Sequence, residues 1–165
     1  MSTPKFTLRA FRKSDVDAIV KHANDKTIAD NTIPIPYPYT RKDAMYWVNK
    51  GSKKTKTSLN LAIDIDGEAV GCIGLHGITA HKAEIGYWLG RNHWGKGIMT
   101  AAVKRMTVLA FSTFKLRRIY APVFSFNAAS ARVLEKAGYQ YEGTLRKAVI
   151  KNGKPIDERL YAKVR

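Results

Sequence analysis

The chain has 165 residues and a mass of 18.5 kDa, a length that fits one domain because a single hydrophobic core serves chains of about 100–200 residues. Its 45% hydrophobic and 25% charged residues are ordinary for globular proteins and argue against both a disordered chain and a membrane protein. Lysine and arginine (29) outnumber aspartate and glutamate (13), and the resulting net charge of +16 predicts an anionic partner or a surface kept soluble by repulsion.

Hydrophobic periodicity predicts helices and strands along the whole chain. In chain order we expect a strand at 6–11, a helix at 14–23, a helix at 41–50, strands at 59–65, 69–75 and 83–89, a helix at 95–114, a strand at 118–124, a helix at 127–138 and strands at 139–145 and 157–164. No repeat or linker interrupts this order, so the sequence predicts a single mixed α/β domain over residues 1–165.

Polar residues and glycines mark the ends of these helices. Ser14, Thr40 and Asn127 stand where a side-chain oxygen accepts hydrogen bonds from first-turn amides. Gly51 and Gly138 follow the last apolar residues of two helices and are expected to end them. Tight turns between strands are expected at Asp66-Gly67 and Asn152-Gly153.

Three prolines at alternate positions occupy the segment 31–40 (NTIPIPYPYT). Proline has no amide hydrogen and fixes φ, so we expect an extended, stiff loop here. Tyr37 and Tyr39 are candidates for the wall of an acceptor site, because binding groups favour loops braced by rigid elements; packing against the helices is the alternative. The residues expected to point inward from the next helix are Met45, Trp47 and Val48.

The segment 84–100 (EIGYWLGRNHWGKGIMT) places two glycines between a strand and a long helix. Gly95 and Gly97 let the backbone approach a ligand closely, so that free amides at the helix start converge on an anion such as a pyrophosphate. A purely structural helix start is the alternative. The segment is not a Walker loop, and Thr100 stands where the third glycine of a dinucleotide-binding GxGxxG belongs.

A second segment, 127–143 (NAASARVLEKAGYQYEG), begins another helix after the next strand. In this order and spacing, WGKGIMTAAV and NAASARVLEKAGYQYEG resemble the pyrophosphate-binding and second coenzyme-binding motifs of the GNAT superfamily of acetyl-coenzyme A dependent N-acetyltransferases. The resemblance is to the branch that contains the ribosomal-protein-alanine (Rim-type) N-acetyltransferases. It extends to LRAFRKSD, the proline loop, EIGYWLG and RLYAKV, and so covers nearly the whole chain.

The resemblance implies a GNAT fold, whose mostly antiparallel seven-stranded sheet splays between strands 4 and 5 and is flanked by about four helices. The strand 84–89 would leave its neighbour after Tyr87 and pair its backbone with the pantetheine amides of acetyl-coenzyme A or coenzyme A. The resemblance assigns the following residues to the coenzyme: Tyr87, Trp88, Leu89, Asn92, Trp94, Gly95, Lys96, Gly97, Ile98, Met99, Asn127, Ser130, Arg132 and Lys136.

Acetyl transfer from a thioester to an amine needs a proton acceptor for the amine, donors for the oxyanion and a proton for the sulfur. The resemblance assigns the first role to Glu84 and the last to Ser130. Backbone amides near Trp88 and Leu89 would be the oxyanion donors. A salt-bridged strand carboxylate and a simple helix hydroxyl are the alternatives for the two side chains.

Three positions depart from the family pattern. Many acetyltransferases carry a tyrosine acid where this chain has Leu134, and a Rim-type protein would carry a glutamate base near Val149. The first polar residue of the glycine motif is Asn92 rather than arginine or glutamine. The pattern therefore supports coenzyme binding more firmly than it supports any acid or base.

The cysteine and histidine content and the hydropathy limit the possible disulfides, metal sites and cellular compartment. Cys72 is the single cysteine and excludes an intramolecular disulfide, and the four histidines lack close cysteine or histidine neighbours, so no metal site is expected. The N-terminus has no apolar signal region, and no stretch approaches the roughly 20 apolar residues of a membrane span. We expect a cytoplasmic protein without a membrane partner.

These observations predict a transferase that moves acetyl from acetyl-coenzyme A to a primary amine by direct attack. The acceptor classes are a protein N-terminus, a lysine or a small amine, and the net charge favours an acidic acceptor or plain solubility. The alternative is a basic nucleic-acid or ribosome-associated binding module with an inactive acetyltransferase fold, although no nucleic-acid-binding motif is evident. A monomer and a homodimer are both compatible with the sequence.

Overall fold

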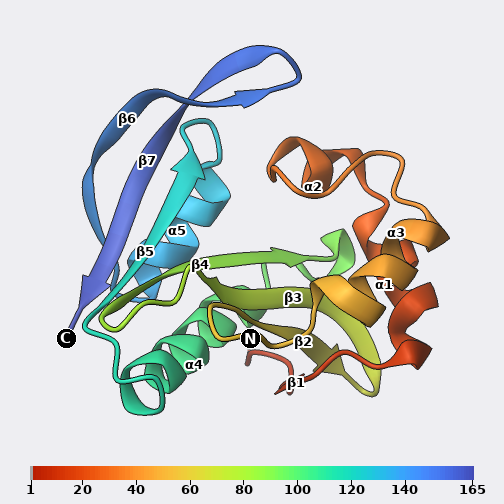
Figure 1. Ribbon diagram of the computed structural model, residues 1–165. Coiled ribbons are helices and arrows are strands. Elements are labelled where there is room, and N and C mark those ends of the chain that lie inside the picture. The colour runs from red at the N-terminus through yellow and green to blue at the C-terminus, as the bar shows by residue number, and fades with distance from the viewer. Residues whose placement is uncertain (1) are drawn as a thin grey trace.

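The computed structural model describes residues 2–165, arranged around a seven-stranded sheet (Figure 1). The strands are β1 (Thr7–Arg9), β2 (Leu59–Ile65), β3 (Glu68–His76), β4 (Lys82–Leu89), β5 (Arg118–Phe124), β6 (Gln140–Lys151) and β7 (Lys154–Val164). The helices are α1 (Val16–Ala23), α2 (Lys26–Asp30), α3 (Arg41–Tyr46), α4 (Ile98–Ser112) and α5 (Ala128–Lys136), with short helical turns at Lys13–Asp15, Trp47–Gly51 and Arg91–His93. The strand order is β1-β2-β3-β4-β5-β7-β6, and only β4 and β5 are parallel. The predicted mixed α/β fold is confirmed.

Helices cover both faces of the sheet (Figure 1). On one face, apolar side chains of α4 and α5 join Ile73 and Leu75 of β3 in a buried core. On the other face, α1 and α3 pack over Cys72, because successive side chains of a strand point to opposite sides. The two helical layers explain why β3 is an almost unbroken apolar run. Within residues 2–165, no helix has the length and hydropathy needed to cross a membrane.

The first helices differ most from their predicted boundaries. The expected cap Ser14 lies inside the turn Lys13–Asp15, and α1 begins at Val16. The short helix α2 was not predicted. Its N-terminus is capped by Asp25, whose carboxylate accepts hydrogen bonds from two first-turn amides. A helix of one turn carries too little apolar periodicity to be found from the sequence.

Thr40 caps α3 as predicted. The helix then widens into the π turn Trp47–Gly51, so the predicted helix 41–50 consists of two different pieces. Met45 does not point inward as expected and is 47% exposed, whereas Val48 is buried. The physical reason is that Ala44, four residues before Val48 on the same helix face, occupies the inward position.

The hairpin of β6 and β7 is longer than predicted. Its turn at Asn152 and Gly153 has positive φ at both residues, as expected for a tight hairpin. The strands continue beyond the predicted limits of 145 and 157, up to this turn. Most side chains of β6 are exposed, so no hydrophobic alternation marks the extension. The hairpin tip projects toward α2 (Figure 1).

β4 and β5 stay together over only three residue pairs, between 82–84 and 118–120. Beyond them β4 remains paired with β3 and β5 with β7, so the sheet opens between the two parallel strands. The divergence begins after Glu84, three residues earlier than the predicted point after Tyr87. The opening is therefore longer than expected.

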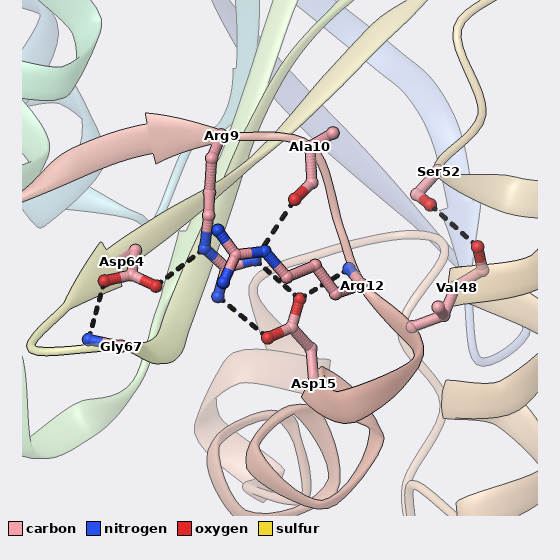
Figure 2. Close-up of polar contacts among 8 residues, drawn as sticks. All are labelled: Arg9, Ala10, Arg12, Asp15, Val48, Ser52, Asp64 and Gly67. Atoms are coloured by element: carbon pink, nitrogen blue, oxygen red, sulfur yellow. Dashed lines mark hydrogen bonds and ion pairs between the residues drawn. The ribbon is translucent and has the colours of Figure 1, made fainter.

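Arg9 ties the first strand to the helical layer above it (Figure 2). Its Nε donates to Asp64 Oδ2 at 2.7 Å, and its two terminal nitrogens donate to the carboxylate of Asp15 at 2.7 and 2.8 Å. Asp15 also accepts the Arg12 amide. Burial alone would raise the pKa of Asp15, but these hydrogen bonds outweigh burial and hold the pKa below its usual value.

Replacing Arg9 tests this contact. In Arg9→Ala, Asp15 stays buried without a counter-charge, so we expect the free energy of unfolding at pH 7 to fall by about 3–5 kcal/mol in urea denaturation. The lowered pKa of Asp15 stabilises the fold above its unfolded value of about 3.9, so the difference should shrink as the pH falls below that value.

Arg41→Ala is the control, because Arg41 pairs with Asp17 on the surface. Exposed ion pairs contribute about 0–1 kcal/mol. If both variants lost the same free energy of unfolding, the Arg9 contact would stabilise the fold no more than a surface ion pair does.

Candidate active site

A cavity of about 770 Å³ occupies the opening between β4 and β5. Its walls come from β4, the glycine turn, the beginning of α5, the end of β5, and α2 with the loop that follows it. Most predicted site residues line this cavity: Tyr39, Glu84, Tyr87, Trp88, Leu89, Trp94, Gly95, Gly97, Ile98, Met99, Asn127, Ser130, Arg132 and Lys136. The other three predicted site residues, Tyr37, Asn92 and Lys96, do not line the cavity.

One wall of the cavity is a free strand edge. The Gly90 amide donates to the Val70 carbonyl at 2.8 Å, on the β3 side. Successive amides along a strand point to opposite edges, so the Leu89 amide points into the opening and the Trp88 amide points to β3. Buried backbone groups need hydrogen-bond partners, and an extended ligand with its own amides fits this edge. Of the two expected oxyanion donors, only Leu89 faces the opening.

The glycine turn forms a second wall. Gly95 and Gly97 have φ of 72° and 74°, a region that residues with a Cβ rarely adopt. No side chain among residues 2–165 caps α4, so its first amides lack a partner within the helix. A Cβ on Gly95 would meet no atom within 4 Å. A Cβ on Gly97 would instead lie 2.8 Å from the Thr3 hydroxyl oxygen, so the open space is at Gly95. Free amides there fit the pyrophosphate that the resemblance implies.

The positive charges at this end come from α5. Arg132 and Lys136 line the cavity. Lys96 instead donates from Nζ to the Asn92 carbonyl at 2.8 Å, outside the lining. The indole of Trp94 donates to the Leu89 carbonyl at 2.6 Å and so ties the glycine turn to the end of β4.

Two hydroxyls meet where α5 begins. Asn127 caps the helix by accepting the Ser130 amide at 3.1 Å, as the sequence predicted. The Ser130 hydroxyl lies 2.8 Å from the hydroxyl of Tyr87 on β4. Burial raises the pKa of Tyr87, so its phenol keeps its proton. Leu134, at the position of the family's tyrosine, is fully buried in the core.

Glu84 lies on a sheet face that also carries a pair of facing glycines. Gly74 of β3 faces Gly86 of β4, and the neighbouring pair on the same face is His76 and Glu84. Neighbouring side chains fill the space above these glycines, since a Cβ on Gly74 would clash with Asn60 Oδ1 and lie 3.1 Å from His76 Nε2. Burial raises the pKa of Glu84, and the negative charge of Glu158 raises it further. A carboxyl with a raised pKa is better matched to proton transfer near neutral pH.

Glu158 of β7 was not predicted, yet it lines the cavity and is 7% exposed. It faces Phe124 of β5 in the register, and burial raises its pKa. One signal in the sequence was available. Along β7 the alternate residues Ile156, Glu158, Leu160 and Ala162 share one face, so the glutamate interrupts an otherwise apolar row.

The loop after α2 lines the cavity, and the β6–β7 hairpin, far away in the sequence, contacts the end of α2. Tyr39 is buried and lines the cavity, whereas Tyr37 is 56% exposed. Lys151, at the tip of the β6–β7 hairpin, donates from Nζ to the Ala29 carbonyl at 2.6 Å and to the Thr32 carbonyl. This contact, the Lys151 bridge, holds the hairpin against the end of α2.

Comparison with known proteins agrees with this geometry. A family model described as an acetyltransferase (GNAT) domain matches residues 5–140. The N-acetyltransferase p20 of Bacillus licheniformis, itself uncharacterised, is 30% identical over 165 residues, which cover 97% of this chain and 93% of that protein.

Two solved structures share the fold. The microcin C7 self-immunity acetyltransferase MccE, in complex with acetyl-CoA and AMP, has a TM-score of 0.88 at 23% identity and covers 98% of this chain and 93% of its own. The ribosomal L7/L12 acetyltransferase RimL, in complex with coenzyme A, has a TM-score of 0.87 at 23% identity, covering 99% and 95%. The family model and the p20 relative show the family, while these two structures show the fold and do not single out the Rim branch.

Substitution of Gly95 tests the glycine turn. In Gly95→Val, the valine disfavours the left-handed backbone and places its side chain in the open space beside the amides, so we expect coenzyme A binding to weaken at least tenfold in calorimetric titration. Gly67→Val is the control, because Gly67 also has positive φ and free space but lies in the β2–β3 turn. Unchanged affinity in Gly95→Val would refute the assignment of the turn.

Proposed function

Because the chain belongs to the GNAT family of acetyl-coenzyme A dependent N-acetyltransferases, we propose that it acetylates a primary amine by direct attack of the amine on the thioester, with no covalent enzyme intermediate. The observation that carries the proposal is the cavity between β4 and β5, where a free strand edge, a glycine turn and a buried carboxyl come together. A basic binding module without catalytic activity would need none of these in one place.

The chain's backbone holds the coenzyme in this proposal. Acetyl-coenzyme A supplies an acetyl group that is already activated as a thioester. The free edge of β4 pairs with the pantetheine amides, and the amides that begin α4 bind the pyrophosphate. Arg132 and Lys136 add positive charge toward the phosphates. The Leu89 amide donates to the carbonyl oxygen as negative charge develops there.

Glu84 accepts the proton of the attacking amine. An α-amine has a pKa near 7.7–8.0 and a lysine side chain one near 10.4, so an acceptor arrives mostly protonated and must lose a proton before attack. The raised pKa of Glu84 brings this carboxyl closer to the pKa of the amine, which makes the transfer easier. Glu84 lines the cavity, from which an acceptor or a bridging water can approach it.

The Tyr87 and Ser130 hydroxyls protonate the departing sulfur. They are 2.8 Å apart and both line the cavity, so a proton can pass between them. The proton that the nitrogen loses on becoming an amide replaces the one given to the sulfur. Many relatives place a tyrosine on α5 for this purpose. In this chain the phenol comes from β4 instead and approaches the same helix at Ser130.

Thiol release tests the activity as a whole. The purified protein is incubated with acetyl-coenzyme A and a panel of primary amines, and free thiol is read with a chromogenic reagent. We expect release that depends on the amine and saturates with it. Coenzyme binding without release for any amine or N-terminal peptide would overturn the proposed transferase activity.

The base is tested with Glu84→Gln. We expect kcat to fall by about 10²–10⁴-fold, because general-base catalysis contributes a factor of this size, while coenzyme A affinity is retained. The acidic limb of the wild-type pH–rate profile should also disappear. Glu142→Gln is the control, since Glu142 pairs with Arg118 outside the cavity. A Glu84→Gln enzyme with full turnover across pH would remove Glu84 from the mechanism.

The acid is tested with Tyr87→Phe and Ser130→Ala. Loss of either hydroxyl breaks the same pair, so we expect each variant to lower kcat by at least tenfold and the double variant to lose little more. Single-turnover kinetics with a thiol readout separates this step from coenzyme release. Losses that multiply in the double variant would show that the two hydroxyls act independently.

A further inference from the structure

Glu158 is a buried carboxyl that the mechanism above does not use. It is 7% exposed and lines the cavity, and it has no hydrogen bond or ion pair to any residue within 2–165. Its carboxyl oxygens reach the open space of the cavity, and a carboxylate that a bound ligand then removes from water needs a partner. Such a group in a ligand cavity indicates that the ligand supplies the partner.

The register places Glu158 on the same sheet face as Glu84. Glu84 faces Tyr120 on β5, and Phe124, four residues further along β5, faces Glu158 on β7. Residues an even number apart on a strand share a face, so the two carboxyls flank the opening from opposite sides. The electrostatic effect of Glu158 on Glu84 agrees with this placement.

The cations of the cavity lie on the other face of the sheet. Arg132 and Lys136 are the only lysine or arginine residues that line the cavity within the described chain, and both belong to α5. α5 packs on the face that carries Ala121 and Tyr161, opposite to the face of Glu158. His76 faces Glu84 and also lines the cavity, but burial lowers its pKa and so favours its neutral form. The acceptor end of the cavity is therefore acidic, although the whole chain carries +16.

We propose that Glu84 and Glu158 form a two-carboxylate acceptor site that selects a primary amine with a second cationic group, the class of the aliphatic diamines. This proposal rests on the proposed function. The amino group that attacks must become neutral, so it cannot balance both carboxylates. A second ammonium group keeps its charge during the reaction and pairs with Glu158.

The step balances without a further reactant. The amine nitrogen forms a bond to the acetyl carbon, the carbon–sulfur bond breaks, and the amine proton passes to Glu84. The thiolate takes a proton from the Tyr87 and Ser130 pair, and the second proton that the nitrogen loses on becoming an amide restores the pair. Glu84 becomes neutral at this point, so the remaining ammonium faces one carboxylate, Glu158. A free amino acid fits less well, because its α-carboxylate would lie beside two like charges.

The test compares 1,4-diaminobutane with 1-aminobutane, which differ by one ammonium group. We expect kcat/KM of the wild-type enzyme to favour the diamine by at least tenfold, and Glu158→Gln to reduce this preference to threefold or less, because an uncompensated charge pair inside a site is worth about one to three powers of ten. Glu142→Gln removes the same charge outside the cavity and should keep the wild-type preference. A wild-type enzyme that uses both amines equally, or a Glu158→Gln enzyme that keeps the preference, would overturn the proposal.

A second measurement separates acceptor selection from folding and from turnover. We expect the acidic limb of the pH profile of kcat to move to lower pH in Glu158→Gln, since the negative charge that raises the pKa of Glu84 is gone. Glu158→Asp keeps the charge and should keep part of the diamine preference, which a merely structural role would not predict.

Binding is read independently of catalysis by titrating 1,4-diaminobutane into the coenzyme A complex in a calorimeter. If no amine releases thiol, the proposed activity fails, but loss of diamine binding in Glu158→Gln still supports the acceptor site. Equal diamine affinity in wild type and Glu158→Gln would overturn the site even if the enzyme is active.

Discussion

Three parallel residue pairs between β4 and β5 are the constraint on which the whole molecule depends. They hold two antiparallel half-sheets in one structure, and their small number leaves the rest of both strands apart. Every other part of the site is placed relative to this opening. β4 contributes a backbone edge and Glu84, the following turn contributes free amides, and β7 brings Glu158 from the far half. A longer parallel contact would pair the same backbone groups within the sheet and leave no cavity.

The net charge of the chain and the charged groups inside the cavity affect ligand binding in different ways. A net charge of +16 describes the long-range field, which attracts anions such as a coenzyme with several phosphates. Inside the cavity the sign varies over a short distance, with cations on α5 on one sheet face and two carboxyls on the other. Local groups decide which ligand is bound at close range, because interactions between buried charges are screened much less than those between exposed ones. The overall charge therefore does not identify the acceptor.

Features encoded by local chemistry were predictable from the sequence. Thr40 and Asn127 cap helices as expected, and Gly95 and Gly97 take the left-handed conformation that their position requires. What the sequence did not reveal depends on pairing over long distances. Glu158 interrupts an apolar row of β7, but only the register shows that this row faces the opening. The same is true of the contact between Tyr87 and Ser130, which joins residues from two elements that only the folded sheet brings together.

The Lys151 bridge gives the two half-sheets a second attachment, remote from the three pairs at 82–84 and 118–120. If the half-sheets were joined only at those pairs, their ends far from the pairs could move apart. Joined at both places, the half-sheets are held at two separate points. Moving them apart at the hairpin breaks two hydrogen bonds from an ammonium group, each contributing about 1.5–3 kcal/mol. The Lys151 bridge therefore opposes separation of the half-sheets at a point where they share no strand pairing.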